Sequence, residues 1–415
     1  MHDRDALAAL DAADPLAPLR DLFELPPGVI YLDGNSLGPL PRATPARIER
    51  VVREEWGRGL IASWNDAGWM AAPARVGDLI ARLIGAAPGQ VAVADTTTVN
   101  LHKVLGALLD LAPAGRRVIL SERDNFPSDL YVAEGLAAGR GLRLELCGAA
   151  EIPARLRDDV AVLMLTHVNY RTGAMHDMAA LTEAARAAGA LVIWDLAHSA
   201  GAVPVDLLGA GADAAVGCGY KFLNGGPGAP AFLWLHPRHA ARAMPTIWGW
   251  LGHARPFDFA PGYAPAEGIA RFVCGTPGVL ATAALEEGVR TLLAAEAHGG
   301  MAAIRAKSLA LTRIFAELVE ARLAGHGLAV VTPREDARRG SQVCLSRAEG
   351  GYGIIQALIA RGVVGDFRAP DILRFGVTPL YTRHVEMWDA VEALRAVLEG
   401  GVWREPRFAR RGLVT

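Results

Sequence analysis

Apolar residues in the first half of the chain form short runs that alternate with helical patterns. Runs at positions 90–94, 117–120, 142–147, 160–165 and 191–194 have the length and continuity of buried strands. Strands that alternate with helices in this order are typical of a mostly parallel sheet with helices on both faces. We therefore predict a large α/β domain. The glycine fingerprint of dinucleotide binding opens none of its strand–helix units, which argues against a dinucleotide enzyme.

The pattern changes after about position 327. Short apolar runs mix with helical patterns between 328 and 398, which predicts a smaller α+β domain, and a long helical pattern at 301–324 leads into it. A chain of 415 residues also exceeds a usual single core. We expect an N-terminal segment at 1–60 that contributes to the small domain and to the site entrance, a large domain at 61–300 and a small domain at 301–415.

Distinctive residues follow several of the expected strands directly. In open parallel sheets, ligands bind at the carboxyl ends of the strands. The residues at or just after these ends are Thr97, Phe126, Thr166, Asp195 and Lys221. We therefore expect them to meet at one edge of the sheet and to form a ligand site there.

The stretch from Leu191 to Gly228 carries the clearest chemistry. Asp195 ends one apolar run, and Lys221 ends the next inside glycine-rich chain. This pair suits pyridoxal phosphate, because a lysine forms its Schiff base and a carboxylate keeps its pyridine nitrogen protonated. Lysine is rare in this chain, which has only Lys103, Lys221 and Lys307 among 42 basic residues, so a lysine beside an apolar strand favours a need for an amine. The alternative is a strand-end lysine that reaches solvent.

Three threonines, Thr96 to Thr98, stand between an expected strand and an expected helix. Backbone N–H groups and the dipole at a helix N-terminus attract phosphate, and hydroxyl groups donate further hydrogen bonds. Simple capping of the helix by one threonine is the alternative. Three in a row exceed what a cap requires, so we favour phosphate.

Two further features leave alternatives open. Arg374 lies in the middle of an apolar run, and since arginine stays charged it needs an anion there, either a substrate carboxylate or an internal Asp or Glu. Three tryptophans without helical spacing stand close together in the sequence, at Trp56, Trp64 and Trp69. They would form either a hydrophobic lid over a core or a wall for a flat ligand.

Composition narrows the class of protein. The formal net charge of −2 and the lack of a basic cluster argue against nucleic acid or an anionic membrane as partner. The N-terminus lacks a signal-peptide pattern, and no apolar run approaches the roughly 20 residues of a membrane span. Four widely spaced cysteines form no metal motif and suggest a reducing compartment. We expect a soluble cytoplasmic protein without a metal site.

Several motifs together resemble the kynureninase family, fold type I pyridoxal-phosphate enzymes of the aspartate aminotransferase superfamily. The resemblance covers nearly the whole chain. Asp-Leu-Ala-His and Tyr-Lys-Phe-Leu-Asn, paired with Asn-Ser-Leu-Gly, are specific to this family. The matching stretches are 32–38, 126–129, 195–198, 220–224, and Arg374 with 379–381.

The resemblance implies a role for each matching residue. Lys221 would form the Schiff base, Asp195 would pair with the pyridine nitrogen and Phe126 would stack on the ring. Thr97, Thr98, Asp129 and Tyr220 would surround the phosphate, Thr166 would lie near the ring, and His198 would support the ring oxygen side. Ser128 would be a further cofactor residue, with Trp250 and Thr276 supplied across a homodimer interface. Arg374 would hold the substrate α-carboxylate, while Trp64, Ser36 and Asn35 would line the substrate side. Tyr220 would either exchange protons during the reaction or only bind phosphate.

The implied reaction is the hydrolytic cleavage of the Cβ–Cγ bond of L-kynurenine, and of 3-hydroxykynurenine, to anthranilate or 3-hydroxyanthranilate and L-alanine. It would serve tryptophan degradation or the synthesis of pyridine nucleotide precursors. Thr276 and Trp64 look like the bacterial pattern that prefers the unhydroxylated substrate. The alternatives are a cysteine desulfurase or an aminotransferase on the same fold, or a cofactor-binding regulatory protein that has lost catalysis.

Overall fold

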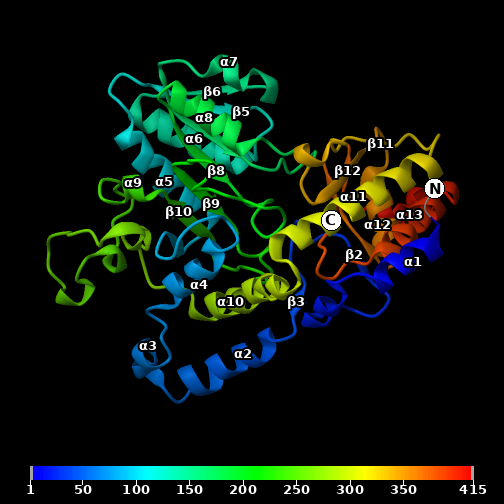
Figure 1. The fold of residues 1–415 in the computed structure, drawn as a ribbon, viewed down its shortest axis with the longest axis horizontal. Coiled ribbons are helices and arrows are strands. Elements are labelled where there is room, and N and C mark those ends of the chain that lie inside the picture. The colour runs from blue at the N-terminus through cyan, green and yellow to red at the C-terminus, as the bar shows by residue number, and fades with distance from the viewer. Residues whose placement is uncertain (1–2, 413–415) are drawn as a thin grey trace.

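The computed structural model describes residues 3–412, and seven strands form its main sheet in the order β4-β10-β9-β8-β7-β5-β6 (Figure 1). The strands are β4 (Val91–Val93), β5 (Val118–Glu122), β6 (Arg143–Cys147), β7 (Val160–Thr166), β8 (Leu191–Asp195), β9 (Ala214–Gly217) and β10 (Phe232–Leu235). Strands β5 to β9 run parallel, and β10 runs antiparallel to both β9 and β4. The predicted mostly parallel sheet is confirmed. Strand β10 was not predicted, although its apolar run is as long as the predicted one at 191–194.

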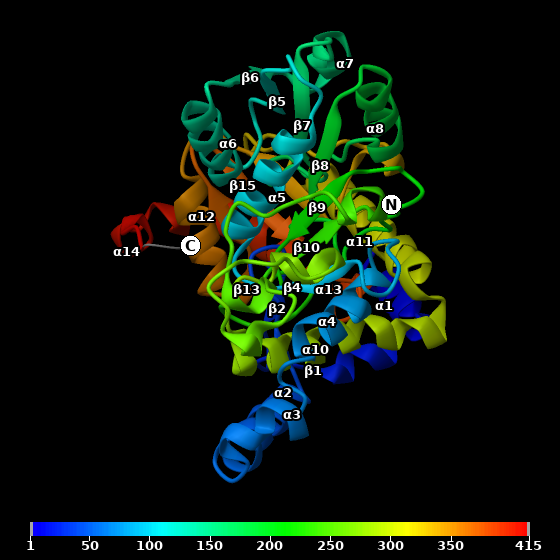
Figure 2. The same ribbon diagram turned by 90° about the vertical axis from the view of Figure 1, so that its left-hand side faces the viewer.

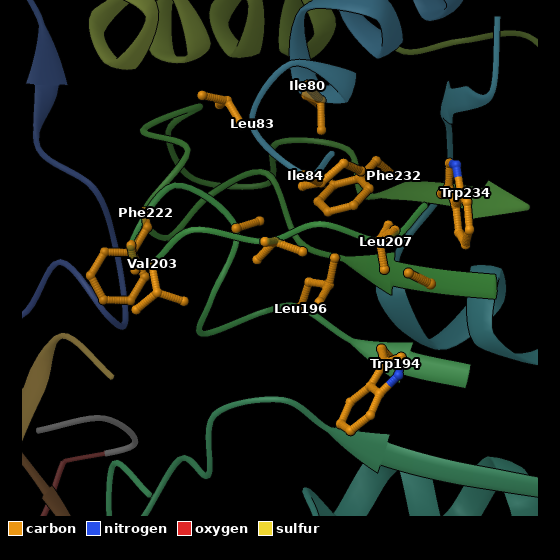
Figure 3. Packing of buried hydrophobic residues seen from close by; sticks show 14 of the residues in the cluster. Ile80, Leu83, Ile84, Trp194, Leu196, Val203, Leu207, Phe222, Phe232 and Trp234 are labelled. Atoms are coloured by element: carbon orange, nitrogen blue, oxygen red, sulfur yellow. The ribbon is translucent and has the colours of Figure 1, made fainter. Parts of the chain in front are cut away.

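Alternate residues of each strand face opposite layers of helices. On β8, Val192 and Trp194 join one core cluster, and Ile193 between them joins the other. Figure 3 shows the first cluster, in which Trp194 and Trp234 lie with apolar side chains from α4. The helices of this layer are α4 (Ala72–Ala81), α8 (Met178–Ala187) and α10 (Val279–Leu293), and those of the other layer are α5 (Thr97–Leu111) and α6 (Pro127–Arg140).

A second sheet has its own core near the end of the chain. Its antiparallel order is β11-β12-β15-β14, with β11 (Ala329–Val330), β12 (Gln342–Ser346), β14 (Asp366–Arg368) and β15 (Ile372–Gly376). The helices α11 (Gly300–Arg322), α12 (Gly351–Ile359) and α13 (His384–Glu399) cover it. In this core the rings of Phe315 and Phe375 lie 5.0 Å apart, centroid to centroid. The expected α+β arrangement after position 327 is confirmed.

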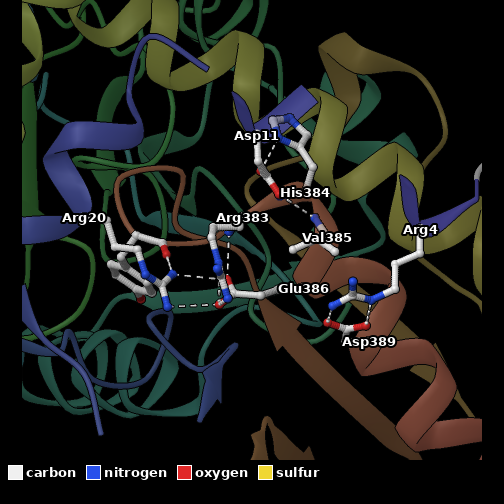
Figure 4. Close-up of polar contacts among 9 residues, drawn as sticks. Arg4, Asp11, Arg20, Arg383, His384, Val385, Glu386 and Asp389 are labelled. Atoms are coloured by element: carbon white, nitrogen blue, oxygen red, sulfur yellow. Dashed lines mark hydrogen bonds and ion pairs between the residues drawn. The ribbon is translucent and has the colours of Figure 1, made fainter. Parts of the chain in front are cut away.

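The N-terminal segment packs on the last long helix (Figure 4). It begins with α1 (Arg4–Ala12), and the Asp11 carboxylate accepts hydrogen bonds from the backbone N–H groups of His384 and Val385, at 2.6 and 2.9 Å. Those groups open α13 and have no partner within the helix. Two ion pairs join the same surfaces, Arg4 with Asp389 and Arg20 with Glu386.

Residues 44–66 project away from both sheets (Figures 1 and 2). They form α2 (Thr44–Arg50), a π-helical turn (Val51–Trp56) and α3 (Ser63–Asp66), and α2 contacts α10. Trp56 and Ile61 are exposed at this projection. The domain boundaries expected at residues 60 and 300 stay predictions.

Several short strands and helices lie between or after these larger elements. They are β1 (Phe23–Glu24), β2 (Ile30–Tyr31), β3 (Leu40–Pro41), β13 (Val363–Val364), α7 (Ile152–Arg155), α9 (Pro237–Ala240) and α14 (Pro406–Ala409). Strand β2 pairs parallel with β13, which adds a further contact between the two ends of the chain. Over residues 3–412, no helix is both long and apolar enough to cross a membrane.

Candidate active site

A cavity of about 360 Å³ opens at the carboxyl edge of the main sheet. This volume is in the range of small-molecule sites. Its lining includes every cofactor residue that the sequence predicts on this chain's own strand ends: Thr97, Thr98, Phe126, Ser128, Asp129, Thr166, Asp195, His198, Tyr220 and Lys221. The parallel strands bring these residues together from widely separated parts of the sequence.

The three threonines occupy the N-cap and the first two positions of α5. Thr96 is the N-cap, with an extended backbone and a hydroxyl that accepts a hydrogen bond from the backbone N–H of Val99 at 3.3 Å. Thr97 and Thr98 lie in the first turn and line the cavity. Both alternatives from the sequence therefore have a place here, since Thr96 caps the helix and all three threonines line the cavity.

Lys221 lies at the centre of the cavity wall. Its Nζ is 3.0 Å from His198 Nε2 and 5.8 Å from the ring centroid of Phe126. Burial, together with the nearby Lys221 charge, holds the pKa of His198 well below its usual range, so this imidazole is neutral. The other ring nitrogen, Nδ1, lies 3.2 Å from Gln342 Oε1 on β12. Gln342, a buried amide in an apolar strand of the second sheet, was not predicted from the sequence.

Two buried carboxyl groups face each other below the lysine. Burial raises the pKa of Asp195, which Lys221 opposes, and burial and Asp195 raise the pKa of Asp129 well above its usual range. Asp195 accepts a hydrogen bond from the Ala197 N–H at 2.8 Å, whereas Asp129 Oδ2 is buried without a hydrogen-bond partner. The pair therefore provides acceptors for a cationic or N–H-bearing group.

Residues behind the cavity wall hold Phe126 and Thr166. The side-chain amide oxygen of Asn125, Oδ1, accepts hydrogen bonds from the Phe126 N–H at 2.7 Å and from the Thr166 hydroxyl. The Phe126 ring packs edge-to-face on Tyr170 at 5.2 Å. Asn125 and Tyr170 were missed in the sequence, and their position beside strand ends is the signal that could have found them.

Arg374 lies between the two sheets and is only 1% exposed. Its Nε donates to Asp366 Oδ1 at 2.8 Å, its Nη2 donates to Ser36 Oγ at 2.8 Å and to Asp366 Oδ2, and its Nη1 donates to the Tyr170 carbonyl at 2.9 Å. All but one of its five N–H groups are therefore engaged within the chain. Of the two anions that the sequence left open, the structure contains the internal one, Asp366.

Further charges surround Asp366. Arg368, which is more exposed than Arg374, pairs with the same carboxylate at 2.6 Å. Burial and the nearby Asp366 raise the pKa of Asp33 to about 7. The sequence analysis missed Asp366 and Arg368 as site residues. Asp366 stands directly opposite Arg374 in the β14–β15 register, so a correct strand pairing is the signal that would have found it.

Besides Arg374 and Ser36, four residues expected in the site do not line this cavity. Trp64 packs edge-to-face on Trp69 in the projecting segment, at 5.5 Å. Trp250 is partly exposed and packs on Phe257, and Thr276 lies shortly before α10. Asn35 is buried against Gly376 of β15, and neither atom of its amide has a partner. The expected roles of these four residues stay predictions.

Comparisons with known proteins are consistent with this arrangement. A family model described as the kynureninase C-terminal domain matches residues 304–394. The chain is 56% identical over 422 residues to a kynureninase from Burkholderia pseudomallei (strain 1106a), with both chains covered completely. It is 53% identical over 421 residues to a kynureninase from Pseudomonas fluorescens, again over the full length of both. The chain belongs to the kynureninase family.

Solved structures of other enzymes share the fold of this kynureninase family member. A cysteine desulfurase from Thermococcus onnurineus NA1 superposes with a TM-score of 0.79 at 18% identity, over 92% of this chain and 98% of its own. A C-DES mutant with glycine covalently linked to the PLP cofactor gives 0.77 at 17% identity, over 95% and 99%. At such identities the likeness shows the fold, and it confirms the predicted fold type I architecture.

Proposed function

We propose that this chain cleaves the Cβ–Cγ bond of L-kynurenine with water, giving anthranilate and L-alanine, with pyridoxal 5′-phosphate held in the cavity. The observation that carries the proposal is the setting of Lys221. The other two lysines are committed to buried ion pairs, with Nζ at 2.7 Å from Asp95 and at 2.6 Å from Asp14. Lys221 instead faces a neutral imidazole inside the cavity, where an amine can react with a carbonyl group.

The lining residues fit the cofactor at each end. The Asp195–Asp129 pair suits a protonated ring nitrogen, and the unpartnered Asp129 Oδ2 has room for a donor, so we assign Asp129 to this end of the cofactor in place of the phosphate end that the resemblance implied. The first turn of α5, with Thr97 and Thr98, suits the phosphate group. The partly exposed Phe126 ring suits stacking on the cofactor ring. When bound, the cofactor supplies an electron sink that stabilises negative charge at the substrate α-carbon.

Proton handling falls to groups around Lys221. The neutral His198 ring lies within hydrogen-bond distance of the lysine Nζ and orients it toward the cavity. Burial raises the pKa of Tyr220 to about 12, so its hydroxyl stays protonated at neutral pH and donates hydrogen bonds. Tyr220 therefore suits donation to the γ-carbonyl oxygen of the substrate as water adds there.

Arg374 suits the substrate α-carboxylate only after an exchange of partners. A carboxylate that binds an arginine bidentately needs two neighbouring N–H groups, and this guanidinium has one free. We propose that the substrate replaces Ser36 on Nη2 and takes the remaining Nη1 N–H. Asp366 then keeps the guanidinium in place through Nε and the other Nη2 hydrogen.

The rival desulfurase reaction needs an exposed, reactive thiol. Cys147, Cys218 and Cys344 are buried, and burial raises the pKa of Cys344 to about 11. Cys274 is partly exposed, and burial also raises the pKa of its thiol. A thiol with a raised pKa is a poor nucleophile at neutral pH, so these cysteines do not favour sulfur transfer.

The direct test is a product assay on the purified protein with L-kynurenine and pyridoxal phosphate. We expect anthranilate, detected by its fluorescence, and an equal amount of alanine. A protein that binds the cofactor and releases no anthranilate would refute the proposed substrate. Conversion of kynurenine to its keto acid without anthranilate, dependent on an added amino-group acceptor, would point instead to transamination.

We also propose that two chains share each active site, in a cytoplasmic enzyme with unpaired thiols. The support is that Trp64, Trp250 and Thr276 lie outside their own chain's cavity, in a region that also exposes Trp56 and Phe257. A partner that covers this region could receive those side chains in its own site.

Co-expression of two inactive variants tests the shared site. Co-expressed Lys221→Met and Thr276→Arg chains should recover about a quarter of wild-type activity. With random pairing, about half of the dimers are heterodimers, and each heterodimer has one intact site of two. Lys221→Met with Asp195→Asn is the matched control, because both lesions fall in the same chain's cavity and no intact site can form. Equal activity of the two mixtures would refute the shared site.

A further inference from the structure

Lys103 is a fully buried lysine near the cavity. It lies on α5 and is 0% exposed, with its Nζ 2.7 Å from Asp95 Oδ2 and 2.6 Å from the Phe272 carbonyl oxygen. Burying an ammonium is costly unless a carboxylate and further acceptors compensate it. In a chain that uses arginine for nearly all its basic positions, a lysine placed here indicates a specific need for a compact cation.

Asp95, the partner of Lys103, lies at the phosphate end of the cavity. It precedes Thr96 to Thr98 and shares the cavity lining with them, and its side chain is 34% exposed. Its backbone is held in the left-handed region, at φ 49°, which aspartate tolerates better than most residues. An ionised carboxylate beside a bound phosphate would repel it unless a cation compensates the charge.

We propose that Lys103 neutralises Asp95 and thereby allows the threonine end of the cavity to hold the phosphate group of the cofactor. Lys103 is thus a positioning residue that acts through Asp95, and the inference rests on the proposed placement of the phosphate. The same ammonium also fixes Phe272, four residues before Thr276. The phosphate end of the cavity is therefore tied to a segment that we expect at the partner's site.

Lys307 offers a matched control within the chain. It is 8% exposed, and its Nζ lies 2.6 Å from Asp14 Oδ2 and 2.6 Å from the Pro379 carbonyl oxygen. Both lysines therefore bind one carboxylate and one backbone carbonyl in a buried setting. Of the two carboxylates, only that of Asp95, the partner of Lys103, lines the cavity.

The test compares Lys103→Met with Lys307→Met by titration of the apoprotein with pyridoxal phosphate and, separately, with pyridoxal. Both variants should unfold at a lower temperature than the wild type. Lys103→Met should weaken binding of pyridoxal phosphate by at least about tenfold and binding of pyridoxal by less than about threefold. Lys307→Met should change neither affinity by more than about twofold.

Asp95→Asn separates charge compensation from simple structural support. If Lys103 acts by neutralising Asp95, removing the carboxylate leaves an uncompensated cation near the phosphate, so this variant should bind pyridoxal phosphate at least as tightly as the wild type. If the ion pair only holds the loop, Asp95→Asn and Lys103→Met should both weaken binding. Weakened binding in both variants would overturn the proposal. If Lys103→Met does not fold, weakened binding in Asp95→Asn alone would overturn it.

Equal losses of pyridoxal phosphate and pyridoxal affinity in Lys103→Met would likewise overturn it. Because these titrations follow cofactor binding and use no substrate, their outcome is independent of whether kynurenine is the substrate. Failure of the wild-type product assay with normal cofactor binding would refute the proposed function and leave the role of Lys103 intact.

Discussion

The cavity at the main sheet and the guanidinium cluster beside it, made of Arg374, Arg368, Asp366 and Ser36, are prepared for ligands in opposite ways. In the cavity, Asp129 Oδ2 has no hydrogen-bond partner, and Lys221 contacts a neutral imidazole in place of a carboxylate. In the guanidinium cluster, two arginines share one carboxylate and nearly every N–H group of Arg374 is engaged.

This difference affects how much binding energy each ligand gains. A cofactor that enters the cavity satisfies polar groups which are already desolvated, so its hydrogen bonds are gained at little cost. A substrate carboxylate at the guanidinium cluster must replace an existing partner, so its net gain is smaller. We therefore expect substitutions in the cavity to have larger effects than those in the cluster.

The largest effect should follow from Lys221→Met. The proposed covalent attachment of the cofactor needs this amine, and the freed amine is also the expected base for the substrate α-proton, so the rate should fall by at least about a thousandfold. Anthranilate release measures the rate, and the visible absorbance of the protein with added pyridoxal phosphate reports the attachment. Near-normal turnover would show that the unsatisfied groups of the cavity do not mark the reacting centre.

In the guanidinium cluster, Arg374→Ala should raise KM for kynurenine by roughly ten- to a hundredfold, the worth of a charge-assisted pair of hydrogen bonds. Asp366→Asn should raise KM less, by roughly three- to tenfold, because the guanidinium remains but loses a charged support. Steady-state kinetics of both variants give the comparison. An Asp366→Asn effect larger than that of Arg374→Ala would mean that Asp366 does more than hold Arg374.

The smallest expected effect is on stability and follows from substitution of Asp33. This residue lies near the charged groups of Asp366, Arg374 and Arg368. Its pKa is raised from 3.8 to about 7, so the folded chain binds this proton more tightly than the unfolded chain. The resulting stabilisation is fully present below the unfolded pKa and is lost as pH rises through the folded one. Asp33→Asn cannot ionise, and it should therefore gain stability over the wild type as pH rises.

Thermal unfolding at about pH 5 and about pH 8.5 measures this difference. We expect the advantage of Asp33→Asn to grow by about 2 °C or more between the two conditions. Asp371→Asn is a control, since this carboxylate pairs with Arg171 outside the guanidinium cluster. A constant difference across pH would show that Asp33 is ionised throughout.

The order of most strands and helices, the edge at which ligands bind and most of the cavity lining could be predicted from the sequence alone. These properties are local, because an apolar run forms a strand where it stands and the residue that ends it must lie at that strand's end. Lys221, Asp195, Thr97 and Phe126 meet in the structure for that reason. Strand β10 was not predicted, although its four apolar residues carry the same signal as the predicted run at 191–194.

The partners that contact the site residues could be identified only from the tertiary structure. Asp366 meets Arg374 through the register of two antiparallel strands, Gln342 reaches His198 from the other sheet, and Lys103 finds Asp95 through the path of the chain around α5. The placement of Trp64 far from its own cavity has the same origin. Such contacts depend on pairing and packing between distant segments, and a one-residue change in register would exchange every one of the strand partners.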